Sequence, residues 1–342
     1  MTCPTLKVHD YDMKEVKTQK YLGDILSSSG SLRDTIEDRR KMGWGKLSEI
    51  AGIVAEMPDT RRVEVGLKLR MVKLVNGTVY SSEARAKVTE VELTRLEQVD
   101  LALLRSLVSG HSKTSRAFTL LEFGVPGIKY LIMIRRLMYH YHLVTRIDSE
   151  LIKKVYMKQK ESSIKGDWFR TLQDDFKFIG EEINDDQIAS FSKPQYKIYI
   201  QEKVKIAAFH AYLALKEKSK KKLKSLEYTS LNIQPYLISD KISSKQIKLL
   251  YSLRSKCYSA KMNLKKMHKG DLKCIFHCNA EETQYHVFEH CQPIRLKLDI
   301  TSSTKLDAIY GTLSEQLEAS QIFEKIDDTR NLMKQNILPG SL

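Results

Sequence analysis

Residues 274–291 read Cys-Ile-Phe-His-Cys-Asn-Ala-Glu-Glu-Thr-Gln-Tyr-His-Val-Phe-Glu-His-Cys, and they hold three of the five cysteines of the chain. Four potential metal ligands follow the pattern C-x3-C-x7-H-x4-C, namely Cys274, Cys278, His286 and Cys291. A structural Zn²⁺ site is tetrahedral and closed by four cysteine or histidine side chains, with two ligands close together and two returned by a short loop or helix. The pattern therefore predicts a CCHC zinc knuckle whose Zn²⁺ is structural and not catalytic.

Two further histidines leave the identity of the third ligand open. His277 lies between the first two cysteines, and His290 directly precedes Cys291. The four-residue gap between His286 and Cys291 fits zinc-site spacing better than an adjacent pair does, so we favour His286. The alternative without metal is a set of scattered buried cysteines, because free cysteine is commonly buried.

Composition limits the class of protein. The chain has 342 residues, 42% of them hydrophobic, with a formal net charge of +15 and a pI of about 9.4. This charge favours a polyanionic partner, with RNA or DNA first. Cysteines gathered into one motif indicate a reducing compartment. No run of eighteen apolar residues and no apolar signal core occur. The sequence predicts an intracellular protein, nuclear or cytoplasmic, that binds neither a membrane nor a small-molecule substrate.

Hydrophobic periodicity predicts a mainly α protein with a small N-terminal β-hairpin formed by residues 6–27. Helices are expected near 31–57, 59–75, 89–108, 118–123, 128–144, 151–160, 167–176, 196–219 and 306–323. We expect five segments, in the order 1–30 residual β-hairpin, 31–146 helical bundle, 147–240 helical linker, 241–295 basic helix plus zinc knuckle, and 296–342 C-terminal tail.

The segment directly before the knuckle is strongly basic. Residues 241–273 hold ten lysines and arginines against one acid, Asp271. Apolar residues at helical spacing predict an amphipathic helix with its basic side chains on the opposite face. A basic helix leading into a zinc knuckle favours phosphate contact, although a solvated helix face has the same composition. The candidate nucleic-acid-binding residues here are Lys248, Arg254, Lys256, Lys261, Lys265 and Lys266.

Several short motifs occur in a fixed order along the chain. They are Lys20-Tyr-Leu-Gly23, Leu104-Arg105, Glu122-Phe-Gly-Val-Pro126, the segment from Trp168 to Asp175, and Leu253-Arg254 ahead of the knuckle. This order, together with the knuckle spacing, resembles the C-terminal half of a non-LTR (LINE-type) retrotransposon reverse transcriptase. The resemblance covers roughly residues 6–295, and the knuckle spacing is most similar to the lineage that ends in a restriction-enzyme-like endonuclease.

The resemblance implies a function for each segment. It assigns Tyr21 and Gly23 to the last palm hairpin beside the primer, residues 31–146 to the thumb, and the knuckle with its basic helix to RNA and target DNA. Relatives often carry Y-G-x-E-x-W after the second thumb helix. Here Ser81 and Arg85 stand at the glycine and tryptophan positions, which affects the local packing expected there.

No catalytic residue is predicted. Polymerases of this type bind two Mg²⁺ through palm aspartates that precede the Tyr-Leu-Gly hairpin, and only about twenty residues precede it here. The paired acids at 174–175, 185–186 and 327–328 are interpreted as helix caps and solvated surface. The sequence thus favours a nucleic-acid-binding fragment without polymerase or endonuclease activity of its own. The alternative is a zinc-stabilised helical adaptor that binds protein; RNA or DNA preference and oligomeric state stay open.

Overall fold

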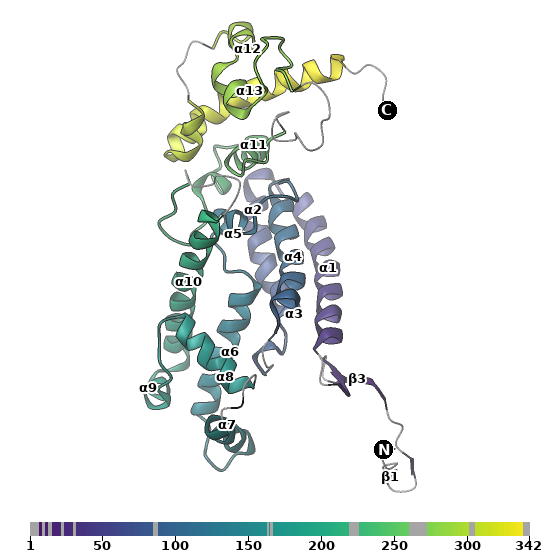
Figure 1. The fold of residues 1–342 in the computed structure, drawn as a ribbon, viewed down its shortest axis with the longest axis vertical. Helices are drawn as coiled ribbons and strands as arrows, with labels where there is room; N and C mark the ends of the chain where they lie inside the picture. The colour runs from purple at the N-terminus through teal and green to yellow at the C-terminus, as the bar shows by residue number, and fades with distance from the viewer. Residues whose placement is uncertain are drawn as a thin grey trace.

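The fold is seen in a computed structural model (Figure 1). It describes residues 7–8, 11–12, 16–21, 24–29, 32–84, 88–162, 164, 167–218, 226–259, 272–300 and 305–337. These residues are mainly helical, as predicted. The molecule is elongated, with the N-terminal strands at one end and the Cys/His segment with helix α13 at the other.

The strands form two separate local hairpins. β1 (Lys7–Val8) pairs with β2 (Tyr11–Asp12), and β3 (Thr18–Tyr21) pairs with β4 (Asp24–Ser27), both antiparallel. The single hairpin predicted over residues 6–27 is therefore wrong in its pairing. The reason is local: the pairing of Tyr21 with Asp24 leaves a two-residue connection, the commonest length in an antiparallel hairpin.

The first helical layer packs α1 along α4. Its elements are α1 (Arg33–Ala55), α2 (Asp59–Leu69), η1 (Arg70–Val75), α3 (Asn76–Thr78), η2 (Ser82–Ala84) and α4 (Glu90–Leu107). Ile50 and Val99 are fully buried between these helices. Thr89 caps α4 by accepting from the backbone of Glu92, whose side chain bonds back to the backbone of Thr89. This reciprocal capping satisfies N–H groups that a helix start leaves unpaired, and it fixes where α4 begins.

Most of the second helical layer packs around α6. Its elements are α5 (Arg116–Phe123), α6 (Ile128–Val144), α7 (Leu151–Ser162), α8 (Trp168–Phe178), α9 (Asp185–Ser190) and α10 (Lys193–Glu217). Asp167 caps α8 as predicted, accepting from the backbone of Arg170. No single helix among the described residues is long and apolar enough to cross a membrane; α5 and α6 together reach that length and composition, but with a bend of 62° between them.

The C-terminal elements pack across the end of this bundle (Figure 1). They are η4 (Pro235–Leu237), α11 (Ser244–Arg254), η6 (His286–His290), α12 (Gln292–Lys297), η7 (Leu306–Tyr310) and α13 (Leu313–Ile337). The helix expected near 306–323 instead begins at Leu313, after η7, and continues to Ile337, with Phe323, Ile326 and Arg330 fully buried along it. The buried hydrophobic residues of this region and of the bundle belong to one core cluster. The boundaries of the five predicted segments stay predictions.

Buried ion pairs connect helices within the bundle. Arg70 donates to Asp100 and to the backbone carbonyl of Pro126, with a distance of 2.7 Å from Nη2 to Asp100 Oδ2. Arg136 on α6 pairs with Asp175 on α8, and both side chains are at least nine-tenths buried. The interpretation of Asp175 as helix cap or solvated surface is therefore wrong, because an arginine from a neighbouring helix neutralises it inside the fold.

Candidate metal centre and the network around it

The structure brings the four predicted metal ligands together. Their ligand atoms all lie within 4.8 Å of one another. The Sγ atom of Cys291 lies 3.6 Å from that of Cys274 and 3.9 Å from that of Cys278, and Cys278 Sγ lies 3.0 Å from His286 Nε2. A tetrahedral Zn²⁺ with Zn–S bonds of about 2.3 Å places two sulfur ligands about 3.8 Å apart. The cluster therefore has the spacing of a site that can hold a metal ion, and zinc is compatible with it.

The first two ligands sit on a tight turn. The backbone N–H of Phe276 lies 3.4 Å from Cys274 Sγ, directed at the sulfur that a metal would bind. His277 and Asn279 have φ of +57° and +60°, which lets the chain reverse within four residues. Cys274 then donates its backbone N–H to the carbonyl of Ala280 at 2.7 Å. The turn holds Cys274 and Cys278 on the same side.

The other two predicted ligands lie at the two ends of the short helix η6, His286 as its first residue and Cys291 directly after it. The Thr283 hydroxyl accepts from the backbone N–H of His286 at 2.9 Å and so fixes where this turn begins. Partial burial lowers the pKa of His286, which favours the neutral imidazole that a metal requires. The hydrogen bond between the Sγ atoms of Cys274 and Cys291 raises the pKa of Cys274 and lowers the pKa of Cys291. A metal ion binds cysteine as the thiolate, so binding of a divalent cation to this sulfur pair would release its thiol protons.

The two alternative histidines lie outside the cluster. His277 is exposed on the first turn, and His290 is exposed and stacked on the ring of Tyr285. Among the described residues, the group that could hold a metal contains His286 and neither of these two. The spacing argument for His286 therefore agrees with the geometry.

A glutamate next to the cluster ties it to α13. Glu282 is fully buried, and its Oε2 accepts from the backbone N–H of Ile275, the residue after Cys274. Its Oε1 accepts from Arg330 of α13, with 3.2 Å to Nε. Arg330 also donates to the carbonyl of Ser259 at 2.8 Å. Sequence reasoning missed this pair because Glu282 and Arg330 are 48 residues apart and resemble surface charges in sequence.

Phe288 forms the apolar centre of the same region. It is fully buried, and its ring packs edge-on against Tyr258 and Phe323 with centroids 5.0 and 5.1 Å apart. Phe288 therefore belongs to the core of this region, and its buried ring is not accessible for stacking on bases. Phe276 is also buried.

Arg254 is not at the surface. It is 3% exposed and pairs with Glu122 at 2.8 Å, while its Nη1 donates to the carbonyl of Ile309. Tyr228 and Tyr236 each donate to Glu122 at 2.6 Å. This placement corrects the prediction that Arg254 contacts nucleic acid, because its donors are used inside the protein. The basic helix is also shorter than expected, since α11 ends at Arg254.

The other predicted nucleic-acid-binding residues have varied positions. Lys248 is exposed on α11, and Lys256 is half-buried with its ammonium 5.3 Å from the ring centroid of Tyr310. Tyr21 pairs with Asp24 through its backbone at the end of β3. The remaining four lie outside the described residues, namely Gly23, Lys261, Lys265 and Lys266.

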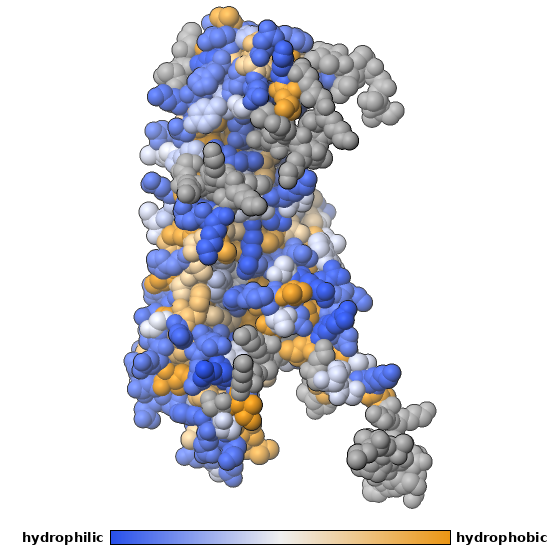
Figure 2. Space-filling model, in the orientation of Figure 1, coloured by the Kyte–Doolittle hydropathy of each residue, from blue (hydrophilic) through white to orange (hydrophobic). Residues whose placement is uncertain are grey.

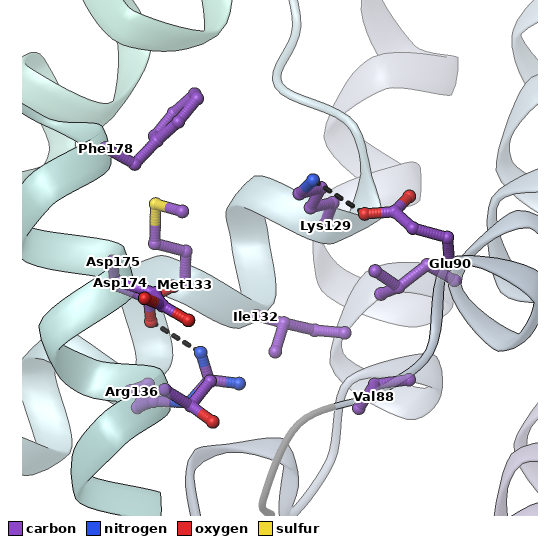
Figure 3. Close-up of a pocket in the computed structure, with 11 residues that line it drawn as sticks. Val88, Glu90, Lys129, Ile132, Met133, Arg136, Asp174, Asp175 and Phe178 are labelled. Atoms are coloured by element: carbon purple, nitrogen blue, oxygen red, sulfur yellow. Dashed lines mark hydrogen bonds and ion pairs between the residues drawn. The ribbon is translucent and has the colours of Figure 1, made fainter. Parts of the chain in front are cut away.

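A separate pocket lies in the bundle, away from the metal centre (Figure 3). Its volume is about 230 Å³, and it is enclosed by the start of α4 and by α6 and α8. Ile132 and Met133 form part of its apolar wall. Lys129 and Glu90 form an ion pair at one end, and Arg136 lies at the other (Figure 3). No sequence motif indicates this pocket, since its residues come from three segments far apart in the chain.

A buried histidine makes the bundle sensitive to acid. His140 Nε2 lies 2.9 Å from the Tyr156 hydroxyl and 3.2 Å from Asp185 Oδ1. Burial lowers the pKa of His140, although Asp185 opposes this shift. Burial would raise the pKa of Asp185, but hydrogen bonds from His140, Lys160 and Tyr156 outweigh burial and lower it.

Acidification is therefore expected to destabilise the bundle. Below the unfolded histidine pKa of about 6.5, the unfolded chain binds a proton that folded His140 does not. The free energy of unfolding therefore decreases as the pH is lowered. The lowered pKa of Asp185 adds a further loss below about pH 4. Urea unfolding at pH 7 and pH 5 should show a smaller pH effect in His140→Gln than in the natural chain. His210→Gln, at an exposed histidine, should keep the pH dependence of the natural chain. If the free energy of unfolding of His140→Gln changes between pH 7 and pH 5 as much as that of the natural chain, His140 is not the source of the acid sensitivity.

Comparison with known proteins gives no relative. No protein-family model, curated protein or solved structure matches this chain. The retrotransposon resemblance therefore rests on the order of the motifs in the sequence and stays a prediction.

Proposed function

We propose that the chain is a nucleic-acid-binding, zinc-stabilised C-terminal fragment of a non-LTR retrotransposon reverse transcriptase. The observation that carries the proposal is the convergence of Cys274, Cys278, His286 and Cys291 to within 4.8 Å in a chain of net charge +15. All four positions of a tetrahedral ion are then protein ligands, so the Zn²⁺ would stabilise the fold without an open position for catalysis. The excess positive charge supplies the attraction to phosphates.

The packing of the motif segments supports the family assignment. Glu122, from Glu122–Pro126, and Arg254, which precedes the knuckle, form a buried ion pair across 132 residues. Trp168 donates its indole N–H to the carbonyl of Glu83 at 2.7 Å. Segments that carry the resemblance in the sequence are thus in contact in the fold, as expected if they form one inherited structural unit.

Two glycine positions of the resemblance also support the assignment. Gly124 has φ of +60°, and a Cβ there would lie 2.0 Å from the backbone of Asn232, so only glycine fits. Ser81 stands where relatives often carry glycine, and its φ is also +60°. This left-handed conformation favours glycine. Arg85, at the tryptophan position, lies outside the described residues.

We propose no catalytic role for the paired acids. Asp175 pairs with Arg136, and Asp185 accepts from Lys160 at 2.8 Å. Asp327 accepts from the Tyr258 hydroxyl. Carboxylates that already have such partners serve the fold, and the proposal predicts no template-dependent primer extension by this chain with Mg²⁺.

Single-stranded RNA binding tests the proposed function. In filter binding, affinity should be micromolar or tighter and should fall at least about tenfold between about 50 and 200 mM salt, because binding releases counterions from phosphates. Lys248→Glu should weaken binding by about three- to tenfold, since Lys248 is exposed on α11 and makes no ion pair with the described residues.

The matched control is Lys154→Glu on α7, which lies at the opposite end of the molecule from α11 (Figure 1). It makes the same charge change at an exposed lysine and should keep the natural affinity within about twofold. Absence of binding at low salt would overturn the proposal.

That negative result would favour the second candidate, a zinc-stabilised helical adaptor for a protein partner. An exposed apolar strip near α7 favours it specifically. Leu151 and Val155 are 77% and 50% exposed and lie four residues apart on α7, and Ile147, 71% exposed, lies in the connection before this helix. Helical residues four apart share one face, as in a docking site for another protein.

A further inference from the structure

The pocket between α4, α6 and α8 is lined by a buried arginine that makes few hydrogen bonds to the described residues. Arg136 is 4% exposed, and among the described residues its hydrogen-bond partner is the carboxylate of Asp175, through Nη1. Its Nε is buried without a partner. A guanidinium has five N–H donors, and a buried donor left without an acceptor is energetically unfavourable. The pocket therefore suits a molecule that offers a hydrogen-bond acceptor to Arg136.

The charges of the pocket exclude an anionic ligand as the best fit. Arg136 is balanced by Asp175, and Lys129 donates to Glu90 at 2.8 Å. Asp174 also lines the pocket, so the lining carries one net negative charge. In Figure 3 both aspartates lie beside Arg136. A neutral molecule with N–H donors next to an acceptor matches this combination of a carboxylate and a guanidinium.

The shape of the pocket favours a flat ring. Phe178 lines the pocket, is 37% exposed, and its ring stacks on that of Tyr130 with ring centroids 5.5 Å apart. A partly exposed aromatic ring that is held in place by a neighbouring ring is a surface on which a base stacks. The volume of about 230 Å³ is below the range of about 300–1,000 Å³ for drug-sized ligands, which suits one base.

We propose that this pocket binds one unstacked guanine base of a single strand. The guanine O6 accepts from Arg136, its N1–H and N2–H₂ groups donate to Asp174, and its ring stacks on Phe178. Guanine presents a carbonyl directly beside these donors, whereas adenine and cytosine carry an amino group in place of that carbonyl. Recognition of a splayed base by stacking and by its Watson–Crick edge is the usual mode for single-stranded RNA. The biological role of this site rests on the proposed nucleic-acid binding.

Calorimetric titration of the full chain with guanosine tests the site, because a nucleoside has no phosphate and cannot use the general basic surface. Saturable binding is expected, with adenosine and cytidine at least about tenfold weaker. Asp174→Asn should weaken guanosine binding about tenfold, and Phe178→Ala should weaken it by a similar factor. Asp186→Asn makes the same chemical change at an exposed aspartate of α9 and should leave guanosine binding unchanged.

Two outcomes overturn this inference, namely no saturable binding of guanosine at millimolar concentration, or equal binding by Asp174→Asn and the natural chain. RNA binding without guanosine binding would refute the pocket and keep the proposed function. Guanosine binding without RNA binding would refute the proposed function and keep the pocket. Circular dichroism of each variant identifies any loss of fold.

Discussion

Replacing Arg254 by leucine is expected to lower the free energy of unfolding by about 3–5 kcal/mol. The change removes the cation that pairs with buried Glu122 at 2.8 Å and leaves this carboxylate with the hydroxyls of Tyr228 and Tyr236. It also leaves the carbonyl of Ile309 without its donor. Burial alone would lower the pKa of Arg254, but Glu122 outweighs it and raises the pKa, so the arginine stays charged. Urea unfolding at pH 7 measures the loss.

A surface pair provides the control. Lys68 and Glu64 are 2.7 Å apart with side chains 71% and 59% exposed, and Lys68→Ala should cost less than about 1 kcal/mol. The double variant Arg254→Leu with Glu122→Gln should be less destabilised than the sum of the single changes, because it removes both charges. A loss within about 1 kcal/mol for Arg254→Leu alone would show that the pair does not hold η4, α11 and the bundle together.

Removal of the metal is expected to open one end of the molecule and leave the rest folded. After zinc chelation, backbone amides of residues 272–298 should exchange with solvent at least about a hundredfold faster, because metal binding supplies local folding free energy. The buried face of α13 should follow, since Phe323 packs on Phe288 and Arg330 is held by Glu282. Amides of α4 and α6 should keep their protection. Hydrogen exchange followed by mass spectrometry measures each segment.

Two cysteine variants separate the metal effect from a general cysteine effect. Cys278→Ser removes a ligand and should reproduce the exchange pattern of the chelated protein. Cys257→Ser changes a cysteine outside the cluster and should keep the protection of the natural chain. Loss of protection in α4 and α6 after chelation would contradict the local role of the metal, and so would an unchanged rate over residues 272–298.

The parts of the fold that follow local rules were predictable from sequence. The helix Ile128–Val144 has the predicted ends, and Asp167 caps α8 as expected. Capping and apolar periodicity involve residues only a few positions apart, so one segment carries the whole signal. The four residues of the Cys/His cluster form such a local pattern too, which is why spacing alone favoured His286 over His277 and His290.

The parts that depend on distant residues were not predictable. Arg254 and Arg330 are charged residues at core positions, and each is stabilised by a glutamate far away in the sequence. Without knowledge of these partners, both arginines resemble surface residues, because arginine is rarely buried unless paired. The same reason explains the error at Asp175, and it explains why α13 was predicted to end near Phe323.

Elemental analysis of the purified natural chain tests the central claim most directly, namely that the Cys/His cluster is a closed zinc site. The expected result is one zinc per chain, retained through gel filtration, kept in Cys257→Ser and lost in Cys278→Ser. Purified natural chain that is folded and contains no stoichiometric zinc would contradict the claim.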